Sequence, residues 1–138
     1  MAAAAIPYWH VWRDDQGVSH QHLDSVGGFR LDIVSEGAAQ IWQRDGGSPS
    51  KVLFLTLIPG QDSSWHENPA PQWIVPLSGR WFVTTMDGVR VEMGPGEISF
   101  GGDQGCQVVD GKRGHCSGAV GSEPAVLMLI QVEDAPQS

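Results

Sequence analysis

The sequence predicts a single all-β domain, and three observations support this prediction. First, apolar and polar residues alternate in short runs. Second, these runs are separated by Gly, Pro, Asp and Asn. Third, no stretch sustains the period of an amphipathic helix. A chain of 138 residues suits one core. Eight short strands with frequent turns favour a jelly-roll barrel, in which closure of the sheet removes exposed edges. An immunoglobulin-like sandwich is the structural alternative, but the chain has no Cys…Trp…Cys spacing.

Turn residues divide the expected strands and justify them in order. The expected strands are residues 29–34, 39–44, 51–58, 72–77, 80–85, 89–93, 97–100 and 125–132. The separating turns are DGG at 45–47, PG at 59–60, SG at 78–79, DG at 87–88 and PG at 95–96. Gly supplies positive φ angles in such turns, whereas Pro and Asp favour turn starts. We therefore divide the single domain 1–138 into an N-terminal arm 1–28, a barrel 29–132 and a tail 133–138.

Targeting signals are not visible in the sequence. The N-terminal stretch MAAAAIPYWHVW lacks a basic region and is broken at Pro7, so we expect no export signal and a cytoplasmic protein. The longest apolar run begins at Ala125 and is far shorter than the roughly 20 residues that cross a bilayer. Cys106 and Cys116 lie ten residues apart, and in a reducing compartment we expect free thiols rather than a disulfide.

The net charge and the absence of several known motifs from the sequence exclude some classes of binding partner. The formal net charge is −8, with only eight Lys and Arg residues. Polyanion binding needs clustered basic residues, so neither nucleic acid nor an anionic membrane is an expected partner. The chain has no Gly-rich phosphate loop, no G-x-S-x-G elbow and no C-x-x-C pair, which disfavours nucleotide binding, serine hydrolysis and structural zinc. A small-molecule ligand or substrate is the remaining expectation.

The most informative motif lies in the segment PGQDSSWHENPAPQWIVPLSG. Its spacing is G-x5-H-x-N-x3-Q-x6-G, formed by Gly60, His66, Asn68, Gln72 and Gly79. This spacing resembles the first signature of the cupin superfamily, G-x5-H-x-H-x3-E-x6-G. Asn68 and Gln72 stand where that signature has a second histidine and a glutamate. The resemblance implies a double-stranded β-helix, or jelly-roll, cupin barrel with a degenerate metal motif.

Further pieces of the chain resemble a narrower group of small cupins, and together they cover most of the sequence. In chain order they are Asp14, Gly17, Ser19, His20, Trp65, His66, Pro69, Gln72, Leu77 to Gly79, Asp87, Gly88, Gly94 to Gly96, Asp103, Gly114 and His115. The usual second cupin motif is incomplete, because Gly102 stands where proline is usual and Gln107 where histidine is usual. Extra residues between Asp103 and His115 leave the place of His115 open.

The resemblance implies a site of His66, Gln72 and His115, as metal ligands and as catalytic residues. His20 or His22 would complete it only by folding over the barrel, so a solvated or capping role is the stronger expectation for both. The metal would be a divalent transition ion (Fe, Mn, Ni, Cu or Zn), although amide oxygens are weak ligands for such ions. The implied reaction is a dioxygenation, isomerisation, dehydration or lyase step. Two alternatives stay open. One is a metal-free enzyme in which His66 is the base, and the other is a non-catalytic binding or sensor module.

Neighbouring residues carry further expectations. Because strands have a two-residue period, Asn68 shares a face with His66, whereas Glu67 faces solvent. Asp103 is a candidate to approach the pocket, and Arg80 either faces inward to an anionic substrate or is an exposed strand charge. If Gln72 faces inward, then Trp73, Val75 and Leu77 face outward and need cover. That cover is either the N-terminal segment with Trp9 and Trp12 or a second subunit, which makes a homodimer a hypothesis.

Overall fold

The computed structural model describes residues 5–133, and within this range the chain forms strands and no helix. The all-β prediction is therefore confirmed. No helix in the described range is long and apolar enough to cross a membrane. The strands are β1 (Ile6–Arg13), β2 (Ser19–Val26), β3 (Arg30–Asp32), β4 (Ile41–Gln43), β5 (Pro49–Leu57), β6 (Gln72–Ser78), β7 (Trp81–Thr85), β8 (Arg90–Met93), β9 (Ile98–Gly102), β10 (His115–Ala119) and β11 (Ala125–Val132).

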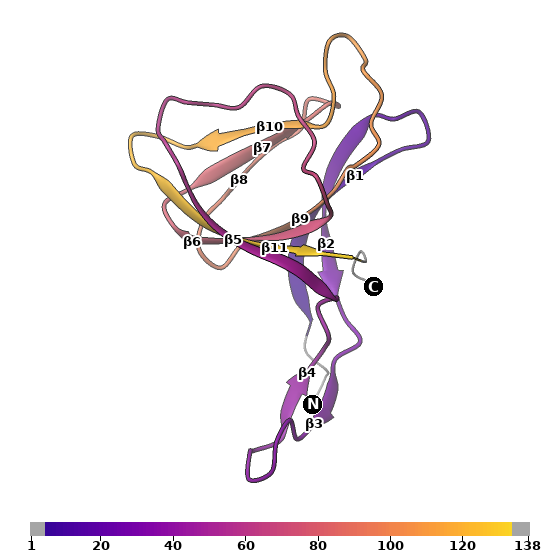
Figure 1. The fold of residues 1–138 in the computed structure, drawn as a ribbon, viewed down its shortest axis with the longest axis vertical. Coiled ribbons are helices and arrows are strands. Elements are labelled where there is room, and N and C mark those ends of the chain that lie inside the picture. Colours follow the sequence, from indigo (N-terminus) through magenta and orange to yellow (C-terminus); the bar gives the residue numbers. More distant parts are fainter. Residues whose placement is uncertain (1–4, 134–138) are drawn as a thin grey trace.

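The strands form two open sheets that face each other across one core, and a separate hairpin. The larger sheet has the order β2-β1-β9-β6-β11-β5, the smaller sheet has the order β10-β7-β8, and β3 pairs with β4. Neither sheet closes on itself. Figure 1 shows β7, β8 and β10 forming a layer over the larger sheet, with the β3–β4 hairpin extending away from both. The core contains Val11, Ile74, Leu127 and Leu129 from the larger sheet and Trp81, Val83, Val91, Met93 and Ala119 from the smaller one.

The expected strands agree with the structure most closely where both faces of a strand are apolar. The last predicted run, 125–132, coincides with β11, which lies between β6 and β5. The runs 29–34 and 39–44 contain only the three-residue strands β3 and β4. Three strands, β1, β2 and β10, were not predicted, because His, Trp, Ser and charged residues interrupt their apolar pattern. Of the expected tail, only Glu133 lies within the described residues.

The residues expected to form an N-terminal arm include two strands of the larger sheet. Strand β1 pairs antiparallel with β2 and parallel with β9, so it lies inside the sheet. The motif residue Gly79 follows β6 with a φ of +73°, and a Cβ there would overlap the carbonyl oxygen of Pro124. The glycine is required by this close approach as well as by its backbone angle.

Alternation along β6 places Gln72 on the inner face and Trp73 on the outer face of the larger sheet. The Trp73 ring packs edge-on against Tyr8 and Phe100, at centroid distances of 5.2 and 4.9 Å. Its indole N–H also donates to the carbonyl oxygen of Gly46 at 2.8 Å. Cover for Trp73 thus comes from Tyr8 and residue 46. Trp9 packs against the inner core instead.

An apolar row on the same outer face is left partly exposed by the described residues. Val75 pairs with Met128, which in turn pairs with Phe54 on the edge strand β5. Phe54 is 71% exposed. The homodimer suggested by the sequence stays a prediction, and this apolar row is the surface through which the two subunits would pack.

His20 joins a turn of the larger sheet to a turn of the smaller one. Its Nε2 lies 2.7 Å from Asp14 Oδ2, and its Nδ1 lies 3.0 Å from Asp87 Oδ2. Asp14 belongs to the β1–β2 turn and Asp87 to the β7–β8 turn. The hydrogen bond to Asp14, followed by that to Asp87, raises the pKa of His20 above its ordinary value of 6.5. A ring that donates from both nitrogens is an imidazolium, so this link is complete only when His20 is protonated.

We predict that this link makes the protein more stable at about pH 6 than at about pH 8. A raised pKa in the folded state means that the stabilisation is fully present below about pH 6.5 and is lost as the pH rises through the folded-state pKa. His20→Phe keeps a ring beside Trp12 but removes both N–H groups. The free energy of unfolding is measured with urea for both proteins, in buffer that contains a chelator. It should differ less between about pH 6 and about pH 8 in the variant than in the wild type. An equal difference in the two proteins would contradict the assignment.

Candidate functional site

A cavity of about 260 Å³ lies between the two sheets, and His66, Gln72 and His115 all line it. The candidate completing ligands do not reach it, because His20 is bound to Asp14 and Asp87 and His22 lies with Asp24 on the outer face. The polar lining of the cavity comes from Ser63, His66, Asn68, Gln72, His115 and Ser117. Leu, Ile and Trp side chains of β5, β6, β7 and β11 form the rest of the wall. The structure therefore brings His66, Gln72 and His115 together at one end of an apolar cavity. A larger hollow of about 540 Å³ lies beside the β3–β4 hairpin, and Arg30 is among the residues that line it.

His66 and His115 are joined by a two-residue backbone bridge. The N–H of His66 donates to the carbonyl oxygen of His115 at 3.0 Å, and the N–H of His115 donates to that of His66 at 2.9 Å. Residues directly opposite each other in an antiparallel pair project their side chains to the same side. The two imidazole centroids are accordingly 4.8 Å apart.

Gly114 allows this bridge to form. Its φ is +76°, and a Cβ there would overlap the carbonyl group of His66. The carbonyl oxygen of Gly114 accepts a hydrogen bond of 2.6 Å from the hydroxyl of Ser19, which is fully buried. The hydroxyl oxygen of Ser19 accepts in turn from the N–H of Met86 at 2.7 Å. The backbone just before His115 is thus fixed on one side by His66 and on the other by Ser19, and this fixes where the His115 side chain projects into the cavity.

The side chain of His115 is oriented by a buried carboxylate. Its Nδ1 lies 2.7 Å from Asp103 Oδ2, and Asp103 is fully buried. An ionised carboxylate only accepts, so Nδ1 carries the proton and the lone pair of His115 is on Nε2. The second oxygen of Asp103, Oδ1, has no hydrogen-bond partner among the described residues. The expected approach of Asp103 to the pocket is therefore made through the ring of His115.

His66 is oriented in the same way by a backbone group. Its Nδ1 lies 2.9 Å from the carbonyl oxygen of Ser64, which can only accept, so Nδ1 again carries the proton. Among the described residues, neither His66 Nε2 nor His115 Nε2 has a protein hydrogen-bond partner. Metal-binding histidines almost always donate their other ring N–H to a carboxylate or a carbonyl oxygen in this manner. The same arrangement also leaves each ring able to accept a proton at Nε2.

Gln72 offers a donor to the cavity more readily than a ligand oxygen. Its side chain is 2% exposed, and its Oε1 accepts a hydrogen bond of 3.3 Å from Gln131 Nε2. The Gln72 amide nitrogen has no partner in the described part of the chain. Rotating both amides by 180° would keep the hydrogen bond and exchange the free nitrogen for a free oxygen. Gln72 fits a metal only after such a rotation, whereas it can orient a ligand acceptor as it stands.

The neighbouring charges lie outside the cavity lining. Glu67 accepts hydrogen bonds from the N–H groups of Gly105 and Cys106, at 3.2 and 2.8 Å, and so fixes the loop that carries Asp103. This position differs from the expected solvent-facing one, because the 103–114 loop folds back over residue 67. Arg80 is half-exposed and pairs with Glu97 at 3.5 Å. Cys106 and Cys116 are free thiols, as expected.

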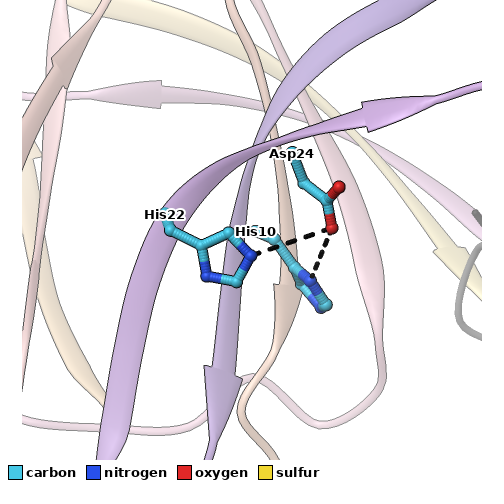
Figure 2. A group of neighbouring side chains, drawn as sticks. All are labelled: His10, His22 and Asp24. Carbon is cyan, nitrogen blue, oxygen red and sulfur yellow. Dashed lines mark ion pairs between the residues drawn. The ribbon is translucent and has the colours of Figure 1, made fainter.

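A second group of side chains could hold a metal ion, and it lies on β1 and β2. Its members are His10, His22 and Asp24, whose ligand atoms all lie within 4.8 Å of one another (Figure 2). No motif in the sequence selects His10. The signal was the hairpin register, which places His10 opposite His22, but it becomes visible only when residues 6–26 are recognised as two paired strands.

No protein-family model matches this sequence, and no curated protein matches it. The resemblance to cupins therefore rests on the motif spacing and stays a prediction.

We predict that Gly114→Ala destabilises the protein more than Gly111→Ala. Both glycines have nearly the same φ, +76° and +75°, but a Cβ at Gly111 meets no atom within 4 Å. The backbone conformation alone should cost about 1–2 kcal/mol in either variant. Gly114→Ala should cost clearly more because its Cβ overlaps the His66 carbonyl group. Urea unfolding measures both values, and equal losses would show that the bridge has room for a side chain.

Proposed function

We propose that this protein is a small-molecule enzyme built on a cupin-type jelly roll, with its reaction site in the cavity between the two sheets. The observation that carries the proposal is the matched orientation of His66 and His115. Both rings line the cavity, and both have Nδ1 bonded to an acceptor, which leaves the Nε2 lone pairs without a partner among residues 5–133. Two such imidazoles on one face can hold a divalent transition metal or take part in proton transfer.

A divalent metal suits the two imidazoles better than it suits the rest of the lining. His66 and His115 would hold the ion through Nε2, and Gln72 would add a neutral oxygen if its amide were rotated. Iron, manganese, nickel, copper and zinc all accept imidazole ligands, and such an ion would polarise an oxygen atom of the substrate. This chemistry is consistent with an isomerase, a lyase or a dioxygenase.

The cavity wall supports a particular kind of substrate. At about 260 Å³ the cavity is just below the usual range for ligand pockets, which begins at roughly 300 Å³. Leu55, Leu127 and Leu129 give it apolar walls, whereas Asn68 and Gln72 supply neutral hydrogen-bonding groups beside the imidazoles. The substrate class that fits is a small, largely apolar molecule with one polar group, which would lie against His66 and His115.

The Asp103–His115 pair favours a second candidate, a metal-free enzyme with His115 as general base. A buried carboxylate on Nδ1 stabilises the imidazolium that forms when Nε2 takes a proton. The sequence alone favoured His66 for this role. His115 is the stronger candidate, because a carboxylate supports a positive ring better than the Ser64 carbonyl group does.

We predict near-stoichiometric transition metal in protein purified without affinity metal or chelator, measured by elemental mass spectrometry. His66→Ala and His115→Ala should each lose the metal that the cavity holds, because each removes one of two imidazole ligands. His22→Ala is the matched control, since it removes an imidazole from the outer group only, and it should keep the metal of the cavity. Metal that is lost in His22→Ala but kept in His66→Ala would contradict the cavity site. Metal-free protein in every sample would favour the base mechanism or a non-catalytic binding module.

A further inference from the structure

The outer face of the β1–β2 hairpin carries a second set of metal-binding side chains. His10 on β1 pairs directly with His22 on β2, and Asp24 lies two residues further along β2. The two-residue period of a strand therefore directs His22 and Asp24 to the same side. The His10 ring packs edge-on against Phe100, which also contacts the outward-facing Trp73. The group thus lies on the face of the larger sheet opposite to the cavity.

Two of the three distances between ligand atoms suit one small divalent ion, and the third is at most 4.8 Å. Asp24 Oδ2 is 3.6 Å from His10 Nδ1 and 3.8 Å from His22 Nε2, as the dashed lines in Figure 2 show. In a tetrahedral zinc site, ligand atoms about 2.0–2.1 Å from the ion stand about 3.4 Å from one another. Both distances are within a few tenths of an ångström of that value. Two imidazoles and a carboxylate select zinc, copper or nickel over magnesium or calcium.

The surroundings keep two of the three groups, His10 and Asp24, in the forms that bind metal. Burial, followed by repulsion from the neighbouring His22, lowers the pKa of His10, so this ring is mainly neutral at neutral pH. The backbone N–H of Ser25 lowers the pKa of Asp24, which is therefore ionised. His22 is exposed and the other two side chains are partly exposed, so water can reach the fourth position of the ion.

Trp12 opposes binding through the tautomer of His22. The Trp12 indole N–H donates to His22 Nδ1 at 3.0 Å. Indole can only donate, so the neutral ring of His22 carries its proton on Nε2, which is the atom facing Asp24. A metal on Nε2 requires that proton to move to Nδ1 through solvent, with no net change in ring charge. The Trp12 N–H would then face another N–H, and the hydrogen bond between the two side chains must break.

We propose that His10, His22 and Asp24 form a zinc-type metal site that is separate from the cavity, and that Trp12 lowers its affinity by holding His22 in the opposing tautomer. Substituting Trp12 therefore strengthens metal binding, although Trp12 is not a ligand. Trp12→Phe keeps a ring stacked on His20 but removes the indole N–H. The gain should be between about twofold and tenfold, the affinity equivalent of one neutral hydrogen bond.

The test is titration of the chelator-treated, full-length protein with Zn²⁺ by calorimetry, after circular dichroism shows that each variant is folded. The wild type should show a binding event that His22→Ala and Asp24→Asn remove and that His66→Ala leaves in place. Trp12→Phe should tighten this event. Trp9→Phe is the matched control, because it removes an indole from the same strand on the inner side, and it should leave the affinity unchanged.

Two results would overturn the proposal. Zn²⁺ binding that is the same in wild type, His22→Ala and Asp24→Asn would remove the site. Binding that depends on His22 but is no tighter in Trp12→Phe than in Trp9→Phe would remove the role of Trp12.

Discussion

The backbone bridge between His66 and His115 is the constraint on which the candidate site depends. It ties the long connection after β5 to the first residue of β10, two segments that are distant in the sequence. Because the paired residues project to one side, the bridge alone places two imidazoles at the cavity. Three neighbouring residues support the bridge. Gly114 allows the close approach of the two backbones, Ser19 binds the carbonyl group before His115, and Asp103 orients the His115 ring.

The cavity histidines and His22 on the outer face of the larger sheet carry their ring protons on opposite nitrogens. In the cavity, acceptors on Nδ1 of His66 and His115 leave lone pairs on Nε2. On the outer face, the indole of Trp12 donates to Nδ1 of His22 and leaves the proton on Nε2. The residue type is the same, but the partner of one ring nitrogen decides what the other can bind. The cavity histidines are ready to bind a metal or a proton as they stand, whereas the outer group has to exchange a tautomer first.

Local sequence patterns predicted most of the strands and the positions of His66 and Gln72 in the site. Strand β11 could be recognised from the sequence because it begins with one unbroken apolar run, residues 125–130. His66 and Gln72 lie in a single short segment, where fixed spacing and strand period suffice to place them. The missed strand β10, HCSGA, has few β-forming residues and is defined by its pairing with β7. The contact between Asp103 and His115 depends on how a loop closes, and the outer group depends on hairpin register, and neither is a local property.

The candidate site requires both cavity histidines to carry their protons on Nδ1. Long-range ¹H–¹⁵N NMR of the metal-free protein at about pH 8, above the ordinary imidazole pKa of about 6.5, reports directly which nitrogen is protonated. His66→Ala and His115→Ala assign the two signals. We expect the Nδ1–H tautomer for both rings and the Nε2–H tautomer for His22. An Nε2–H tautomer at either His66 or His115 would contradict the candidate site, because the cavity would then have a donor where a ligand or base is required.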